Sequence, residues 1–174
     1  MIKSLVSLLS LVSLAFRKSP ALRVLCSVMR EVADELIRVV DQAAEALSIL
    51  SETEADKSYR DGGWSRKQLI GHLIDSASNN HQRFVRAQQV SFLEFPKYEQ
   101  ESWVSLQNYK QAPWPELVDF WRLYNHHLAR VIRTVSPDKL QVGCKVGPSE
   151  PMNLGDLIKD YLRHVKHHLG QLGA

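Results

Sequence analysis

Apolar residues recur at alternating steps of four and three in four long segments of this 174-residue chain. This spacing puts the apolar side chains of each segment on one face of a helix, which must pack against other helices. The segments cover residues 31–50, 66–89, 115–135 and 154–169. With 44% hydrophobic residues, the chain is long enough for one domain with a substantial core. We therefore predict an all-α four-helix bundle with no β-rich stretch of consequence.

Capping signals mark where three of these helices begin. Ser65 followed by Gln68 forms a capping box for the second helix. Pro115 suits the first turn of the third helix, since its missing N–H would be unpaired there anyway. Asn153, with Asp156 three residues later, is predicted to cap the last helix.

Two connections complete the predicted layout. The connection between the second and third helices contains Pro96 and Pro113, and we expect a short helix near residues 100–106 within it. The other connection, residues 136–151, contains three prolines and two glycines. This composition predicts a loop or a hairpin.

Residues 1–28 are predicted to be a leader or a mis-called N-terminal extension, which leaves residues 29–174 as the domain. An apolar run over residues 4–16 is too short to span a membrane but suits a signal peptide. No convincing small-residue cleavage site follows it, and Met29 leads directly into a good helical pattern. We therefore favour a cytoplasmic location, with export by a working signal peptide as the alternative.

Charge and cysteine content narrow the classes of partner. Residues 1–28 carry four basic and no acidic side chains, which leaves 18 basic and 19 acidic side chains elsewhere. Without a basic stripe that includes aromatic residues, we expect no nucleic-acid partner. We also expect no membrane partner, with the leader as the ambiguous segment. Cys26 and Cys144 are far apart and are interpreted as free thiols in a reducing compartment, with one disulfide as the alternative.

Two histidines near the end of the chain occupy positions that a bundle normally fills with aliphatic residues. His164 and His168 are four residues apart, so their rings share one helix face. They continue the predicted buried face of Leu157 and Tyr161, which also includes Gln171. Neutral imidazoles inside a bundle need partners, and a metal ion is a common one.

The second helix carries a polar stripe beside its apolar face. His72, Ser76, Asn79 and Arg83 recur at steps of four, three and four, and Asp75 adjoins them. If this stripe faces the interior, His72 joins the two later histidines as a site with open coordination positions, as a catalytic metal requires. The residues predicted to orient the imidazole rings are Asp75, Asn79, Asp160 and Gln171. A surface or packing role for the histidines is the alternative.

The other histidines and the tryptophans are given structural roles. We expect His167 to be exposed or to contact a ligand residue, and His81 to lie at a pocket edge or on the surface. His126 and His127 are assigned to a polar rim or a dimer surface, because adjacent helical residues cannot share a face. Core or pocket-wall positions are predicted for Trp103, Trp114 and Trp121. The sequence lacks His-Glu-x-x-His, a glycine-rich phosphate loop and Gly-x-Ser-x-Gly.

Several motifs together resemble the DinB/YfiT-like superfamily over about residues 31–171. The resemblance lies in Trp64-Ser65, Gly71-His72-Leu73-Ile74-Asp75-Ser76, Asn79, Arg83-Phe84, Tyr98-Glu99-Gln100-Glu101-Ser102-Trp103 and His164-x-x-His167-His168. It implies an up-down-down-up four-helix bundle that is often dimeric. It also implies that His72, His164 and His168 bind one divalent metal, for which we favour Zn or Ni. The chain departs from the family in its leader and in the early end of its last helix.

Members of this family include metal-dependent thiol transferases, and others are named only as metal-dependent hydrolases. The resemblance therefore implies transfer of a low-molecular-weight thiol to an electrophilic small molecule. We expect Asp75 or Asn79 to orient His72, and Arg83 to hold a carboxylate of the thiol. Tyr98 and Trp103 would form an aromatic wall. The predicted partners are a small-molecule substrate and a second copy of the chain.

Three alternatives to the transferase stay open on the sequence. One is a hydrolase that uses water activated at the metal. Another is a non-catalytic binding module that the metal stabilises. The last is a purely structural bundle whose histidines are solvated.

Overall fold

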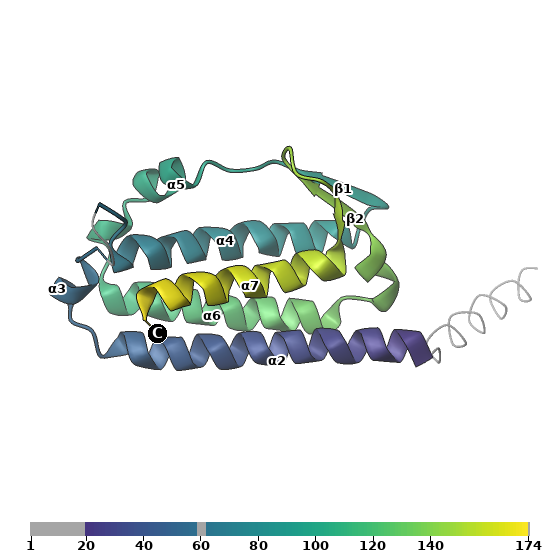
Figure 1. Cartoon of the computed structure of the whole chain (residues 1–174), viewed down its shortest axis with the longest axis horizontal. Coiled ribbons are helices and arrows are strands. Elements are labelled where there is room, and N and C mark those ends of the chain that lie inside the picture. The colour runs from purple at the N-terminus through teal and green to yellow at the C-terminus, as the bar shows by residue number, and fades with distance from the viewer. Residues whose placement is uncertain (1–19, 59–61, 174) are drawn as a thin grey trace, which may run out of the picture.

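Four long helices lie side by side in the computed structural model, which describes residues 20–58 and 62–173. They are α2 (Pro20–Ser48), α4 (Arg66–Ala87), α6 (Trp114–Thr134) and α7 (Leu154–Leu172). Helices α2 and α7 run in one direction, and α4 and α6 run in the other (Figure 1). The predicted up-down-down-up bundle is therefore confirmed.

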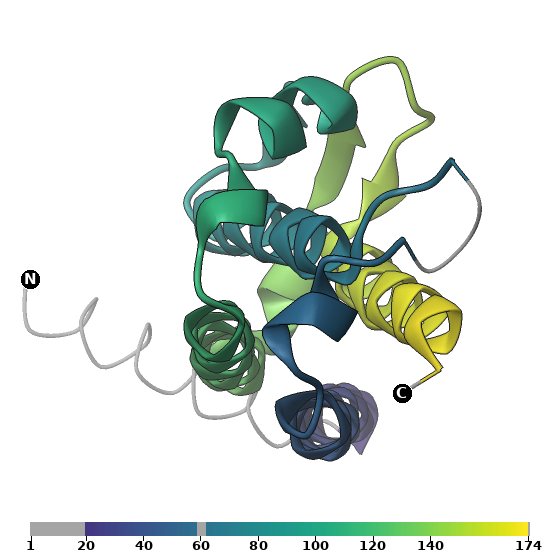
Figure 2. The same cartoon turned by 90° about the vertical axis from the view of Figure 1, so that its left-hand side faces the viewer.

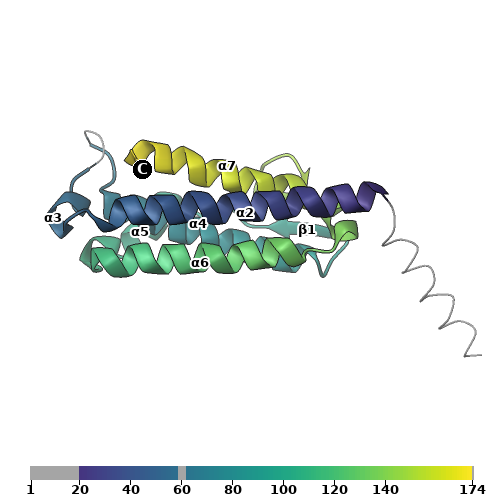
Figure 3. The same ribbon diagram turned by 90° about the horizontal axis from the view of Figure 1, so that it is seen from below.

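The four helices form a square in cross-section, with α2 and α4 on one diagonal (Figure 2). Each of these two helices packs on both α6 and α7. Seen from the α2 side, α6 and α7 flank α2 along its length (Figure 3). The apolar faces meet along the axis of the bundle, where one fully buried residue from each helix marks the core: Leu36, Leu73, Leu128 and Val165.

Helix α2 begins earlier than predicted. Instead of starting near residue 31, it starts at Pro20 and includes the last nine residues of the predicted leader. No helix-breaking residue follows Pro20, and Met29 is 3% exposed in the core. Leu25 and Val28 also pack partly against that core, so this part of the predicted leader belongs to the bundle. Residues 1–19 lie outside the described residues.

The predicted capping signals are confirmed. The Ser65 side chain accepts a hydrogen bond from the Gln68 backbone N–H, and the Gln68 side chain accepts one from the Ser65 N–H. At the start of α7, the Asp156 backbone N–H donates to Asn153 Oδ1 at 2.8 Å. Pro115 occupies the first turn of α6. The side-chain contacts of Ser65, Gln68 and Asn153 satisfy N–H groups that have no partner within the helix.

A small sheet that the sequence analysis did not predict lies across one end of the bundle. Strands β1 (Phe92–Phe95), β2 (Gly143–Val146) and β3 (Met152–Asn153) are ordered β1–β2–β3. Strand β1 is parallel to β2, and β2 is antiparallel to β3. The expected hairpin within residues 136–151 therefore exists in part, after the short helix η2 (Pro137–Gln141). The strands were missed because elements of two to four residues show no usable periodicity.

The connection between β1 and α6 covers the beginning of α4. It contains the predicted short helix, α5 (Gln100–Leu106), and a second short helix, η1 (Tyr109–Gln111). The Tyr109 ring packs directly on Gly71, where a Cβ atom would lie 2.1 Å from that ring. At this same end of the bundle, α3 (Glu52–Ala55) links α2 to α4, and Glu52 accepts a hydrogen bond from the Trp114 N–H at the start of α6. None of the helices in the described ranges is both long and apolar enough to cross a membrane.

Candidate metal centre

Three histidines from two helices meet at one end of the bundle. His72 lies in the second turn of α4, whereas His164 and His168 lie in the last three turns of α7. Because these helices are antiparallel, the beginning of α4 is beside the end of α7 (Figure 1). One ring nitrogen from each histidine lies within 4.8 Å of the others. The sequence-predicted trio is thus brought together, in an arrangement that could bind a metal.

The rings of this triad have nitrogens with no protein partner. His72 is fully buried, and neither of its ring nitrogens makes a hydrogen bond; the same holds for His164 Nε2. Burial, with the neighbouring histidines as a smaller cause, lowers the pKa of His72 to about 3. It lowers the pKa of His164 to about 4. The imidazoles are therefore neutral near pH 7, which is the form that coordinates a metal.

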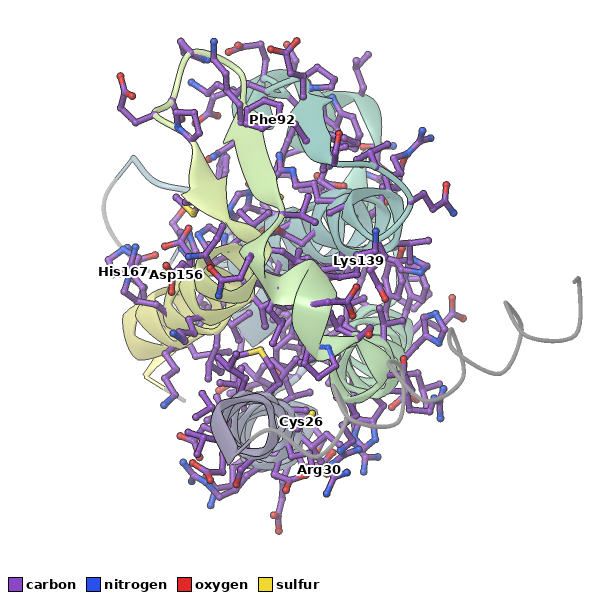
Figure 4. The ribbon with its side chains drawn as sticks, turned by 90° about the vertical axis from the view of Figure 1, so that its right-hand side faces the viewer. Cys26, Arg30, Phe92, Lys139, Asp156 and His167 are labelled. Atoms are coloured by element: carbon purple, nitrogen blue, oxygen red, sulfur yellow. The ribbon has the colours of Figure 1, made fainter. Side chains whose placement is uncertain are left out.

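A hydrogen-bond chain on α7 orients the third ring. His168 Nδ1 donates to Gln171 Oε1 at 2.8 Å, which leaves Nε2 as a free acceptor. The Gln171 amide nitrogen lies 3.2 Å from His167 Nε2. Metal-binding histidines commonly donate their second N–H in this way. The structure thus supports the orienting role predicted for Gln171, and His167 lies on the outer side of α7, as expected (Figure 4).

Trp64 closes one side of the triad, a contact that sequence reasoning missed. Its ring centroid is 5.1 Å from that of His72, and its Nε1 donates to Glu101 Oε2 at 3.0 Å. Glu101 belongs to α5, so this bond ties the start of α4 to the covering connection. The Trp64-Ser65 motif indicated that Trp64 stands just before the helix. The motif did not indicate that the indole packs on His72.

The orienting role predicted for Asp75 and Asn79 is not supported. Asp75 Oδ1 accepts hydrogen bonds from the Tyr109 hydroxyl at 2.6 Å and from the Gln107 amide. Its carboxylate therefore holds the connection over α4 instead of orienting His72. Asn79 Nδ2 donates to the Asp75 backbone carbonyl of its own helix. Both side chains are hydrogen-bonded to partners other than a histidine ring. Tyr109 and Gln107 lie more than thirty positions from Asp75 in the sequence, so the spacing of a motif could not predict these contacts.

Asp160 likewise does not orient a ring. Its carboxylate pairs with Arg163 one turn later on the outer surface of α7. Such an exposed pair of neighbouring helical residues satisfies Asp160 locally.

Arg83 and Tyr98, two residues assigned to the site from the sequence, lie beside His164, and the roles predicted for them stay predictions. Arg83 is 8% exposed, and its guanidinium lies 5.2 Å from the centre of the Phe95 ring. Both side chains line a cavity that His164 also borders. Trp103 packs against Tyr98, with their ring centroids 4.8 Å apart. Trp103 thus supports the aromatic wall, and Tyr98 forms its surface.

Two of the cavities that border the triad contact different histidines. One, of about 300 Å³, is bordered by His168, Trp64, Gln171 and Glu101. The other, of about 230 Å³, is bordered by His164, Arg83, Tyr98 and Tyr161. Gln100, at the start of α5, borders both. A metal at the triad would therefore have one cavity beside His168 and another beside His164.

The remaining histidines lie away from the triad. His81 stacks edge-on against His127 at 4.9 Å between ring centroids, and its Nδ1 lies 3.2 Å from the Tyr124 hydroxyl. His126 Nε2 contacts Asp41 Oδ1 at 2.8 Å, which links α6 to α2. Trp114 and Trp121 are buried in the core. Both cysteines are free, as expected.

Comparison with known proteins places these observations in a family. The sequence model of the DinB superfamily matches residues 31–172. YfiT of Bacillus subtilis, provisionally named a metal-dependent hydrolase, is 34% identical over 62 residues, which cover 33% of this chain and 35% of YfiT. A relative from Oceanobacillus iheyensis with the same provisional name is 28% identical over 125 residues, 71% of each chain. The match to YfiT thus spans about a third of that relative.

Two solved structures share the fold. YfiT from Bacillus subtilis, described as a four-helix bundle of unusual topology, superimposes with a TM-score of 0.66 at 23% identity, over 84% of this chain and 82% of YfiT. The mycothiol-dependent maleylpyruvate isomerase superimposes with a TM-score of 0.65 at 17% identity, over 91% of this chain and 63% of the isomerase. At these identities the likeness extends to the fold alone.

Proposed function

The chain belongs to the DinB superfamily, and on that premise we propose that it is a metal-dependent enzyme that transfers a low-molecular-weight thiol to an electrophilic small molecule. The proposed ligands are His72, His164 and His168. Their fit to a divalent metal is supported by the unpartnered nitrogens of buried His72 and His164 and by the N–H that His168 gives to Gln171. Imidazole donors suit Zn and Ni among other metals.

When bound, a divalent metal would lower the pKa of a small thiol and favour its thiolate. The reaction then forms a bond from sulfur to the electrophilic carbon and breaks the bond from that carbon to its leaving group. The thiol proton goes to solvent. The protein would position the reactants and exclude water through the Trp64 ring, which packs on His72, and the Tyr98 ring, which borders the cavity at His164.

The two cavities at the triad are the observation that carries this proposal. A transfer reaction needs both molecules at one centre. One cavity borders His168 and the other borders His164, so each could hold one of the two molecules beside the triad. Holding two reactants in place makes the reaction effectively unimolecular. A structural neighbour with this fold is named as mycothiol-dependent, which is the reason for choosing a thiol as one of the two.

Turnover of chloroacetamide with several thiols tests the proposal. We expect protein loaded with Zn or Ni to consume the thiol and release chloride, and to stop when a chelator is added. His168→Ala should lower the rate at least about a hundredfold, since losing an interaction worth about 2.7 kcal/mol has that effect. His127→Ala is the matched control, because His127 also packs against a histidine but lies outside the triad. No thiol-dependent rate with either metal would contradict the transferase.

Hydrolysis is the second candidate, favoured by the names of the relatives. It would use the same ligands with water in place of the thiol. Metal-dependent cleavage of an ester or amide without any added thiol would support it over the transferase. A non-catalytic, metal-stabilised binding module is expected to bind metal yet turn over nothing in either assay. The homodimer and the cytoplasmic location stay predictions.

A further inference from the structure

A buried arginine without an acidic partner borders the cavity beside the metal centre. Arg83 is 8% exposed and forms no ion pair with any carboxylate of the described ranges. Its one hydrogen bond, from Nη1 to Asn80 Oδ1, is long at 3.4 Å, and its Nε has no partner. The Phe95 ring, 5.2 Å from the guanidinium, is its other contact, so no acidic group within the described ranges balances the buried charge.

The rest of the cavity adds a second positive charge and neutral polar groups. Lys97 borders it from the connection after β1, and Ser76, Asn80 and Ser149 contribute polar groups. Lys97 is held in place by the turn after β2, since a Cβ atom on Gly147 would lie 2.8 Å from the Lys97 Cβ and the Gly147 N–H donates to the Phe95 carbonyl at 2.9 Å. Asp160 is the acid among the bordering residues, and it is paired with Arg163.

From this arrangement we propose that the cavity binds the carboxylate of a small molecule through Arg83 and Lys97, with the reactive end of that molecule toward His164. This inference rests on the proposed function for the role of the metal, but not for the binding of the anion. A guanidinium matches a carboxylate with two parallel hydrogen bonds, and such charge-assisted bonds are stronger than neutral ones. The cavity volume, about 230 Å³, suits a molecule of a few carbon atoms beyond its carboxylate.

The carboxylate can belong to either of the two reactants, which are the thiol and the electrophile. The shared chemistry is the same, because both would have to place a sulfur or an electrophilic carbon beside the triad. The binding experiment therefore uses two probe pairs, each an acid and its neutral amide. Succinate and succinamide represent a molecule without sulfur, and N-acetylcysteine and its amide represent the thiol.

Calorimetric titration of the Zn-loaded full chain tests the proposal. We expect at least one acid to bind about tenfold or more tightly than its amide, a difference of about 1.4 kcal/mol. Arg83→Gln should remove this preference, and Lys97→Gln should reduce it. Arg86→Gln is the matched control, since Arg86 lies three residues later on the same helix and is exposed. If Arg83→Gln loses the preference for N-acetylcysteine over its amide, the carboxylate belongs to the thiol. If Arg83→Gln loses only the preference for succinate over succinamide, the carboxylate belongs to the electrophile.

Two further measurements separate this inference from the proposed metal function. His168→Ala should keep the acid preference, because His168 does not border this cavity. Arg83→Gln should unfold at about the same temperature as the wild type, since removing a buried charge without an acidic partner offsets the lost contact with the Phe95 ring. Equal binding of acid and amide by the wild type would overturn the proposal. An acid preference that survives Arg83→Gln and disappears in His168→Ala would also overturn it, because the anion would then bind at the metal.

Discussion

At the scale of the residue, the site depends on a few side chains whose partners are far away in the sequence. His72 needs α7 beside it, and Asp75 needs Tyr109 and Gln107 from the covering connection. The type of each residue was readable in advance, because histidines and carboxylates on a buried face need partners. Which partner each one found depends on distances that only packing determines.

Gly71 provides a direct test of how closely the connection approaches α4. We expect Gly71→Ala to destabilise the protein by about 2 kcal/mol or more, because its Cβ atom would overlap the Tyr109 ring at 2.1 Å. Gly170→Ala is the matched control. No atom lies within 4 Å of its new Cβ, so the better helix propensity of alanine should stabilise α7 by about 0.5–1 kcal/mol. Urea unfolding measures both, and a neutral Gly71→Ala would contradict the close contact.

The bond between Asp75 and Tyr109 can be isolated with a double-mutant cycle. Tyr109→Phe leaves the buried carboxylate with one donor fewer and should cost about 1–3 kcal/mol. In the Asp75→Ala background the same change should cost much less, so the free energies of unfolding should not add. Tyr124→Phe, which removes a hydroxyl whose partner is His81 and not Asp75, should give the same effect in both backgrounds. Additive effects of Asp75→Ala and Tyr109→Phe would show that the bond contributes nothing.

At the scale of the element, long helices were predictable and short strands were not. The apolar repeat of α4, α6 and α7 extends over five or more turns, and the capping residues of α4 and α7 marked their first turns. Strand β1 has four residues and pairs with β2, about fifty positions later in the sequence. Its stability comes from that pairing and from Leu93, which is 7% exposed. Such pairing has no local sequence signal.

The ion pair between Glu35 of α2 and Lys166 of α7 should make the stability of the fold depend on pH. Hydrogen bonds from Arg38 and then Lys166 lower the pKa of Glu35 to about 2. The folded pKa is thus below the ordinary value of 4.5, so the pair stabilises the fold above about pH 4.5 and is lost as the pH falls toward 2. We expect Glu35→Gln to cost about 1 kcal/mol at pH 7, since the site is partly exposed. Urea unfolding of both proteins should show this difference shrinking between pH 5 and 2. Glu45→Gln is the control on the same helix, because the Glu45 carboxylate forms no ion pair within the described ranges.

At the scale of the whole molecule, a bound metal should couple α4 to α7. Because a ligand that binds only the folded state stabilises it, zinc at a hundred times its dissociation constant should add about 2.7 kcal/mol. For a chain of this length that raises the melting temperature by roughly 5–10 °C. A chelator should reverse the shift, and His168→Ala should abolish it. Calorimetry of His127→Ala should show the full shift, and a shift that persists in His168→Ala would place the metal elsewhere.

The sequence by itself determined the helical class of this protein, most helix ends and the three histidines, because periodicity, caps and residue chemistry are local properties. It also indicated Arg83 and Tyr98 as residues of the site. Only the tertiary structure decided that α2 extends back to Pro20, that a sheet covers one end and that Asp75 holds the connection instead of a ring. The reason is that each of these features joins segments distant in the chain, and the packing of the whole bundle selects among partners that are locally equivalent.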